Sequence, residues 1–274
     1  MTMTHTVNAP IHALLGALQR TTIIDLEQPR YAGAPTFAAH QPGFVYSLHR
    51  RHEPGLGRTS ASGIIVTAEH SGTHIDALCH QAFEQEMFGG VKVNAQVQTS
   101  TGFTELGAET IAPMVTRGVM IDVAGFRGVD RIPSGDLIGA GELQAAAAAQ
   151  AVSVGAGDVV LVRTGNGAIW NDPEEYLKGA GMAPSVSDWL AEREVLAVGA
   201  DNVAWDGIVT IDPDHGTLPG HTILLVKHGI FILENVLLEE LAAQNQHQFA
   251  FVCCPLKMVG VTGSPVRPLA IVSG

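Results

Sequence analysis

Basic residues are scarce in this chain of 274 residues. Lys and Arg number 15 against 27 Asp and Glu, which gives a formal net charge of -12 at pH 7 and a pI near 5.3. Proteins that bind nucleic acid need basic side chains to neutralise phosphates, and an anionic membrane surface makes a similar demand. We therefore expect no nucleic-acid partner and no membrane partner.

Long apolar runs and paired cysteines are also missing. Every apolar run is interrupted well before the roughly 18 residues that a membrane span requires. The N-terminus, MTMTHTVNAPIHALLGALQR, lacks the basic start of a secretion signal. Three cysteines, Cys79, Cys253 and Cys254, cannot build a disulfide framework. With 46% hydrophobic residues, we expect a soluble globular protein of the cytoplasm.

Strand-like and helix-like segments alternate from about residue 118 onward. Strand-like runs cover 119–123, 158–165, 195–202, 229–234 and 249–259, and helix-like runs cover 141–150, 187–194 and 237–244. This alternation predicts an α/β fold, a single compact domain with a mixed, partly parallel sheet flanked by helices. Residues 25–62 are rich in Pro and Gly and predict short strands and ordered loops.

An apolar stripe marks the N-terminal segment. Ile11, Leu14, Leu15 and Leu18 recur at helical spacing after Pro10 and predict a helix over residues 10–20. That helix would either lie on the core or contact another subunit. We divide the chain into an N-terminal helical arm, residues 1–21, and one domain, residues 22–274.

The most informative segment is EHSGTHIDALCH, residues 69–80, which holds His70, His74, Asp76 and His80. In an extended chain the outer two histidines would lie about 33 Å apart, too far to share one site. Gly72 permits a sharp turn that would fold the first histidine back. We expect a strand over residues 63–70, then this turn, then a helix that begins near Asp76 or later.

Two imidazoles and a carboxylate form a typical ligand set for a divalent ion with an open coordination position, and such a site activates water. The competing interpretation is a polar hydrogen-bonded cluster or a helix cap. Without a metal, each buried imidazole and carboxylate would need its own partner, at a desolvation cost of a few kcal/mol. The segment therefore favours a metal site.

The run HSGTHIDALCH resembles the HxGTHxDxxxH signature of the putative cyclase family of metal-dependent hydrolases, which includes bacterial kynurenine formamidases and isatin hydrolases. Residues 23–37, 157–165 and 221–241 resemble further stretches of that family in the same order. The resemblance implies a swivelling β/β/α-like domain and a homodimer or homotetramer. The residues that it implies are metal ligands at His70, His74, Asp76, His221 and Glu234, a proton donor and acceptor at His80, and a substrate-binding aromatic at Phe37.

His221 and Glu234 also have ordinary interpretations. The histidine follows Gly220 and would suit the surface, and the glutamate would favour the start of the next helix. Cys79 is more typical of a small core residue than of a nucleophile. Gly139 and Gly141 lack the third glycine of a dinucleotide site. His215 and His228 have no assigned role, and Trp170, Tyr176 and Trp205 are expected in the core rather than in a pocket.

These patterns together predict a metal-dependent hydrolase with a small-molecule substrate and one or two divalent ions, zinc or manganese. Water activated by the metal would open a small amide, an N-formyl or lactam C–N bond, while His80 moves the proton. A lactone or ester hydrolase at the same site is the nearest alternative. A metal-binding scaffold without catalytic activity is the alternative from another class.

Overall fold

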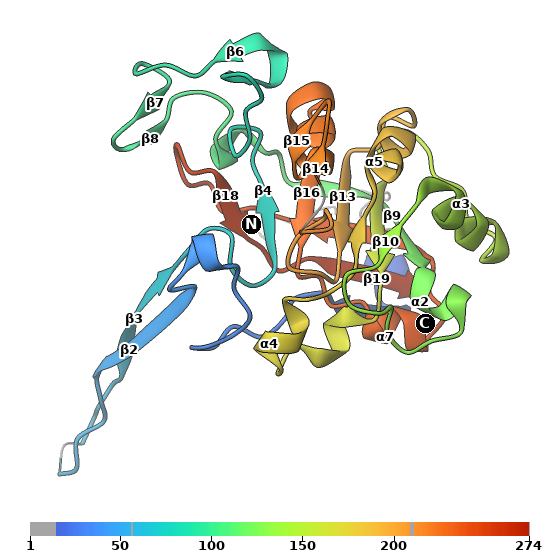
Figure 1. Ribbon diagram of the computed structural model, residues 1–274. Helices are drawn as coiled ribbons and strands as arrows, with labels where there is room; N and C mark the ends of the chain where they lie inside the picture. Colours follow the sequence, from blue (N-terminus) through green and yellow to red (C-terminus); the bar gives the residue numbers. More distant parts are fainter. Residues whose placement is uncertain (1–14, 56, 209–210, 274) are drawn as a thin grey trace, which may run out of the picture.

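Nine strands form the central sheet of the computed structural model, which describes residues 15–55, 57–208 and 211–273 (Figure 1). The nine are β1 (Thr21–Asp25), β4 (His74–Asp76), β9 (Met114–Asp122), β11 (Val159–Arg163), β13 (Ala197–Ala200), β16 (Phe231–Glu234), β17 (Gln248–Cys253), β18 (Gly263–Pro265) and β19 (Leu269–Ser273). Their order is β1-β19-β17-β9-β11-β13-β16-β4-β18. The four strands β9, β11, β13 and β16 are parallel, and antiparallel strands flank them on both sides.

The middle strands are buried on both faces, as their continuous apolar runs require. Val160 and Val162 of β11 contact a core that includes α3 (Ala140–Ala149), α5 (Pro184–Ala191) and the π-helical segment η5 (Thr222–His228). Val159 and Leu161 point to the opposite face, where β1, β17 and β19 supply the second core. The period of two along β11 thus divides the interior into two layers.

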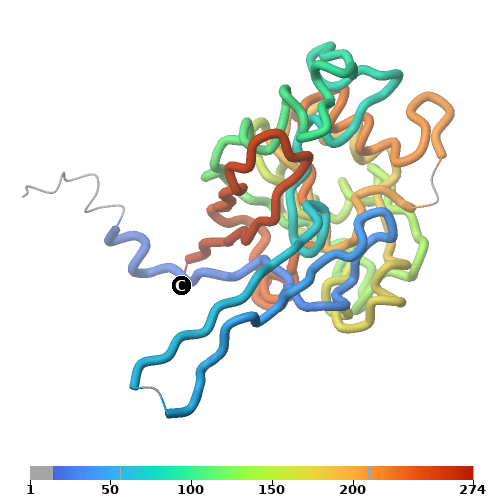
Figure 2. The backbone as a smooth tube through the Cα atoms, turned by 90° about the vertical axis from the view of Figure 1, so that its left-hand side faces the viewer, coloured from blue at the N-terminus to red at the C-terminus, as the bar shows by residue number. Residues whose placement is uncertain are grey.

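Shorter elements complete the structure. The short helices are α2 (Val123–Arg127), α4 (Pro173–Tyr176), α6 (Pro219–His221) and α7 (Glu239–Ala243), and the 3-10 turns are η1 (Ala38–His40), η2 (Phe88–Gly90), η3 (Ala108–Thr110) and η4 (Asn166–Ile169). Two-stranded pairs join β2 (Phe44–Arg50) to β3 (Ser62–Thr67), β5 (Glu86–Met87) to β6 (Val91–Lys92), β7 (Gln98–Thr99) to β8 (Gly102–Phe103), β10 (Leu137–Ile138) to β12 (Gly181–Met182) and β14 (Ile211–Asp212) to β15 (Gly216–Thr217). The hairpin β2–β3 projects away from the body (Figure 2). Among the described residues, no helix combines the length and the apolar character needed to traverse a bilayer.

The predicted α/β fold with a mixed sheet is confirmed, and most predicted elements from residue 118 onward match a strand or helix to within a few residues. The helix expected near Asp76 is wrong. Residues 74–76 form β4, whose backbone pairs with β16 on one side and β18 on the other, and a turn follows. Strand pairing on both sides outweighs the local preference of the segment.

The N-terminal helix is described only from Leu15. Residues 15–18 are helical, while Ile11 and Leu14 lie outside the described residues. Leu15 is 50% exposed and Leu18 is 40% exposed. The described turn of this helix therefore does not pack its apolar side chains on the core.

Candidate metal centre

A sharp turn at Gly72 brings His70 to Asp76. The glycine has a φ of +59°, in the left-handed region that disfavours other residues. A Cβ atom at this position would lie 2.7 Å from Nη1 of Arg30, whose guanidinium donates to the carbonyls on either side of the glycine. After the turn, Nδ1 of His70 lies 2.7 Å from Oδ1 of Asp76. The predicted bend is confirmed.

Strand pairing places three of the predicted ligands on one face of the sheet. His74 and Asp76 are alternate residues of β4, so their side chains point to the same side. Glu234 ends β16 and pairs directly with His74, and directly paired residues share a face. The sheet therefore brings a carboxylate from late in the sequence to the motif at residues 70–80.

A fourth side chain, His221 from α6, closes the cluster. Its Nε2 lies 3.3 Å from Oε1 of Glu234 and 3.6 Å from Oδ2 of Asp76. Nε2 of His74 lies 3.4 Å from Oε2 of Glu234 and 3.5 Å from Oδ1 of Asp76. These separations exceed good hydrogen-bond lengths. Ligand atoms that bind one tetrahedral ion at about 2.0–2.1 Å lie about 3.3–3.4 Å from one another. The four separations in the cluster are close to this value.

Two polar atoms of the cluster are left without partners. Nε2 of His74 and Oδ2 of Asp76 are buried and have no hydrogen-bond partner among the described residues. Leaving such groups unsatisfied costs about 1–3 kcal/mol each. The chemistry and spacing of the donor set therefore fit a divalent metal ion better than a self-sufficient polar cluster.

Hydrogen bonds behind the cluster set the orientation of its imidazoles. Nδ1 of His74 lies 2.8 Å from the carbonyl oxygen of Gly72, and Nδ1 of His221 lies 2.7 Å from Oδ2 of Asp206. Both rings thus turn Nε2 toward the centre, as metal-ligating histidines commonly do. Asp206 also accepts hydrogen bonds from the backbone N–H groups of Gly220 and His221, so it holds α6 in place.

Asp206 was not among the residues predicted from the sequence. Its one available signal is position, because it follows the carboxyl end of the parallel strand β13, where functional groups of α/β sheets collect. That signal does not identify a residue.

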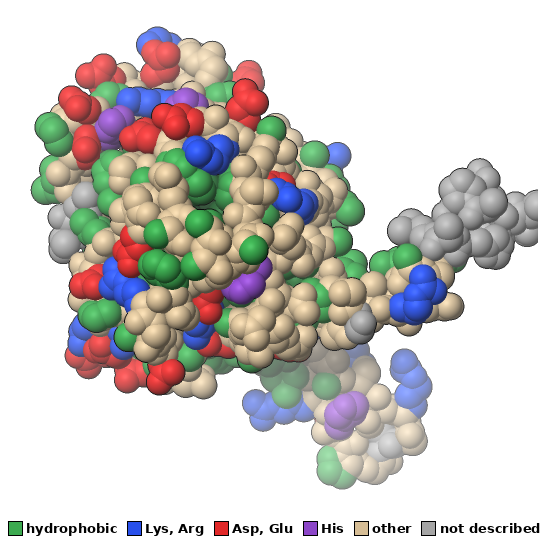
Figure 3. All heavy atoms as spheres, turned by 90° about the vertical axis from the view of Figure 1, so that its right-hand side faces the viewer, with side chains coloured by type: hydrophobic (Ala, Val, Ile, Leu, Met, Phe, Trp, Pro, Cys, Tyr) green, Lys and Arg blue, Asp and Glu red, His purple; other side chains and the backbone are tan. Residues whose placement is uncertain are grey.

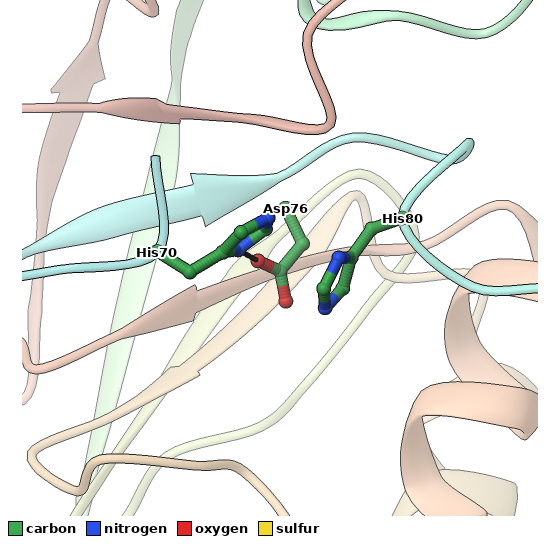
Figure 4. Close-up of side chains that lie close together, drawn as sticks. All are labelled: His70, Asp76 and His80. Atoms are coloured by element: carbon green, nitrogen blue, oxygen red, sulfur yellow. Dashed lines mark hydrogen bonds and ion pairs between the residues drawn. The ribbon is translucent and has the colours of Figure 1, made fainter. Parts of the chain in front are cut away.

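A second possible ligand group adjoins the first. Ligand atoms of His70, Asp76 and His80 all lie within 4.8 Å of one another (Figure 4). The rings of the two histidines stack with their centroids 3.9 Å apart. Asp76 belongs to both groups. His80 is therefore close enough to serve either as a ligand or as a proton carrier.

The buried charges balance one another in the metal-free protein. Burial raises the pKa of Asp76, but His80, His70 and His74 outweigh this effect, and the net pKa lies well below the ordinary value. Burial is also the main cause that lowers the pKa of His80 to about 3. His80 is therefore neutral at pH 7.

His221 shows the opposite behaviour. Burial alone would lower its pKa, but the hydrogen bond to Asp206 and the nearby carboxylate of Glu234 outweigh burial, and the pKa rises well above the ordinary value. A proton on His221 therefore compensates the nearby carboxylates when no cation is bound.

A cavity of about 410 Å³ lies over the cluster. His70, His80, His221 and Glu234 form its polar floor. Phe37, the predicted substrate-binding aromatic, also lines the cavity, as do the apolar side chains of Val203, Ile208 and Leu218. The structure thus places Phe37 beside the cluster, and its contact with substrate stays a prediction.

His40 is a second residue of this site that the sequence analysis missed. It lines the same cavity from η1, and its ring centroid lies 4.9 Å from that of His70 and 6.3 Å from that of His80. Burial lowers its pKa. No motif in the sequence singles out this histidine, because only the fold of residues 38–43 brings it to the motif.

The remaining residues considered in the sequence are not part of the candidate metal centre. Cys79 is buried, its Sγ donates to the carbonyl oxygen of Val261 at 3.7 Å, and burial raises its thiol pKa to about 12, so it is not a thiolate. His215 is held by Asp212 at 2.8 Å, and His228 is exposed. The three expected core aromatics are buried, namely Trp170, Tyr176 and Trp205.

Comparisons with known proteins agree with this geometry. Residues 24–207 match the model of the family described as putative cyclase. The chain is 26% identical over 245 residues to a kynurenine formamidase of Bacillus thuringiensis, which covers 89% of this chain and 94% of the relative. It is 26% identical over 250 residues to an isatin hydrolase of Roseibium aggregatum, with 87% and 84% covered.

A solved structure described as a novel cyclase superposes on this fold with a TM-score of 0.83 at 26% identity, covering 96% of this chain and 91% of the other. The matched family model spans more than half of the chain and includes His70, His74, Asp76 and His80. The chain therefore belongs to the putative cyclase family.

Proposed function

We propose that this protein is a metal-dependent hydrolase that opens a small amide, either an N-formyl group or a lactam. The observation that carries the proposal is the cluster of His74, Asp76, His221 and Glu234, whose facing ligand atoms lie 3.3–3.6 Å apart beneath a cavity. The names of two relatives, kynurenine formamidase and isatin hydrolase, support the amide class, because a formamide and the isatin ring each contain a C–N acyl bond.

The four clustered side chains would hold one divalent ion, zinc or manganese, and His70 with Asp76 would contribute to a second. Such a cation would supply Lewis-acid activation of water and of the substrate carbonyl. Asp206 and the carbonyl oxygen of Gly72 keep the two imidazoles pointed at the ion.

In this proposal, His80 moves the proton. It lines the cavity, and burial keeps its imidazole neutral at pH 7. We propose that it takes a proton from the attacking water and returns it to the leaving nitrogen. A C–O bond forms, the C–N bond breaks, and the products are a carboxylic acid and an amine. With Cys79 held as a thiol, no acyl-enzyme is expected.

The cavity supports a compact substrate with an apolar body. Its volume of about 410 Å³ lies within the range of small-molecule sites, and its apolar lining includes Phe37, Val203, Ile208 and Leu218. His40 and Gln81 add polar groups to the lining. An aromatic ring against the apolar lining would leave the scissile bond facing the cluster.

The test is a metal analysis combined with a substrate screen. Protein loaded separately with zinc and manganese is assayed on N-formylkynurenine, isatin, simple lactones and aryl esters. We expect stoichiometric metal and turnover of at least one amide. Turnover of lactones and esters alone would make the protein an ester hydrolase, and bound metal without turnover of any substrate would indicate a scaffold.

A further inference from the structure

Both ring nitrogens of His70 have hydrogen-bond partners. Nδ1 lies 2.7 Å from Oδ1 of Asp76, and Nε2 lies 2.8 Å from Oγ1 of Thr262, the residue immediately before β18. A neutral imidazole has one hydrogen and one free electron pair. The partner of Nε2 can therefore decide whether Nδ1 faces Asp76 with a hydrogen or with an electron pair.

Glu69 determines the direction of the hydrogen bond between Thr262 and His70. Acidic side chains commonly lie on the outside of the body, as Figure 3 shows for one face, but Glu69 is half-buried and bonded within the protein. Its Oε2 accepts from the backbone N–H groups of Thr262 at 2.5 Å and Gly263 at 3.0 Å. That oxygen is therefore an acceptor, and the Thr262 hydroxyl, 2.6 Å away, donates its one hydrogen to it.

The hydroxyl of Thr262 can then only accept from His70. Its hydrogen is directed to Glu69, so the hydrogen between Oγ1 and Nε2 has to belong to the ring. In the neutral ring, Nδ1 keeps its electron pair and points at Asp76. His74 and His221 have the opposite arrangement, because each bonds backward through Nδ1 and turns Nε2 to the centre.

Gly263 lets the backbone approach the same ring. A Cβ atom at this position would lie 2.7 Å from Cε1 of His70 and 3.2 Å from its Nδ1, closer than ordinary contacts allow. The ring is thus held against residues 262 and 263 by a hydrogen bond at Nε2 and by close packing at Cε1. A larger residue at position 263 would displace Nδ1 from Asp76.

We propose that Thr262 and Glu69 are positioning residues, which keep the hydrogen of His70 on Nε2 and present Nδ1 as the atom that would bind a cation. Hydrogen bonds to the second nitrogen of a ligating histidine commonly fix its tautomer and orientation in this way. This role rests on the proposed function, because His70 is a metal ligand there. If Glu69 and Thr262 served the fold alone, their loss would lower stability without moving the hydrogen of His70.

Nuclear magnetic resonance of protein labelled with ¹⁵N-histidine tests the proposal. Long-range ¹H–¹⁵N spectra of the metal-free and the zinc-loaded chain show which ring nitrogen carries hydrogen, and His70→Gln identifies the signals of His70. We expect hydrogen on Nε2 in both forms and a zinc-dependent change at Nδ1. A bare Nε2, or zinc bound to Nε2, would overturn the proposal. A chain that binds no zinc would contradict the proposed function instead, while the metal-free spectrum still decides the role of Thr262.

Glu69→Ala separates positioning from support of the fold. The Thr262 hydroxyl remains in this variant but can donate to Nε2, so hydrogen should move to Nδ1 of His70. Glu69 and Thr262 line a cavity of about 370 Å³, which gives water access to the freed N–H groups. Hydrogen that stays on Nε2 in the folded variant would overturn the role of Glu69.

Thr262→Val and Thr262→Ser form a matched pair for metal binding. The valine removes the acceptor of Nε2 and should lower zinc affinity about 10–100-fold, whereas the serine keeps the hydroxyl and should bind zinc as the parent does. Thr116→Val is the control, because that hydroxyl donates to the carbonyl oxygen of Gly157 on another strand. Competition with a chelator measures the affinities. Equal affinity in the two Thr262 variants would contradict the proposal, and the spectra of the unmodified chain decide if Thr262→Val misfolds.

Discussion

His74 and Glu234 face each other across the β4–β16 pair, with Nε2 of the histidine 3.4 Å from Oε2 of the glutamate. This pair joins the two parts of the candidate metal centre. His74 belongs to the motif at residues 70–80, and Glu234 belongs to the segment at residues 221–234. Neither segment alone provides four ligand atoms at the observed spacing.

Asp76→Asn should remove most of the bound metal. The carboxylate belongs to both ligand groups, so its loss removes a charge from each, and metal affinity should fall by more than about 100-fold. The measurement is the metal-to-protein ratio by elemental analysis. Asp212→Asn is the control, since that carboxylate also accepts from a histidine, His215, but lies outside the cluster. An unchanged ratio in Asp76→Asn would exclude Asp76 as a ligand.

Asp206→Asn should weaken metal binding without removing a ligand. The asparagine amide has one acceptor oxygen, and its NH2 group cannot accept, so the variant loses part of the support of His221 and of α6. We expect metal affinity to fall about 10–100-fold. Asp158→Asn is the control, a buried carboxylate that accepts from Arg117 away from the site. If both variants lose stability equally and bind metal equally, Asp206 has only a structural role.

His80→Ala should separate catalysis from metal binding. Loss of the proton carrier is expected to lower kcat by about 10²–10⁴-fold while the metal-to-protein ratio stays constant. His228→Ala is the control, because that histidine is exposed. A fall of one metal equivalent in His80→Ala would show that the residue is instead a ligand of a second ion.

Metal uptake should release protons. In the metal-free protein, Asp206 and Glu234 outweigh burial and raise the pKa of His221 well above its ordinary value, so the imidazole is protonated at pH 7. A metal ion needs the unprotonated Nε2, and protons therefore favour the metal-free form. Affinity should fall as pH falls, by up to about tenfold per pH unit for each proton released. Titration calorimetry in two buffers of different ionisation enthalpy measures the release, and equal heats would contradict it.

Gly72→Ala should destabilise the fold and disturb the site. The new Cβ would combine a φ of +59° with a contact of 2.7 Å to Arg30, at an expected cost of about 1–3 kcal/mol. Gly128→Ala is the matched control, with a φ of +71° and no atom within 4 Å of the added Cβ. Thermal unfolding and metal content check the pair. Equal losses in both variants would mean that the Arg30 contact contributes nothing.

Much of the sheet was predictable because its signals are local. The apolar run of β11 and the alanine-rich α3 lie where composition and periodicity predict them. The helix expected near Asp76 or later is absent because β4 is paired on both sides, by β16 and β18, and such pairing depends on residues far along the chain. Local preference carries no information about those partners.

The same distinction holds for the candidate site. Spacing within residues 70–80 was enough to predict a turn at Gly72 and a cluster around Asp76, because a short segment constrains its own geometry. His221 and Glu234 entered only through resemblance to a family, and Asp206 and His40 were not identified at all. These four reach the cluster through strand pairing and helix placement. Their positions depend on the tertiary structure, because a complete set of metal ligands forms only when segments distant in the sequence pack together.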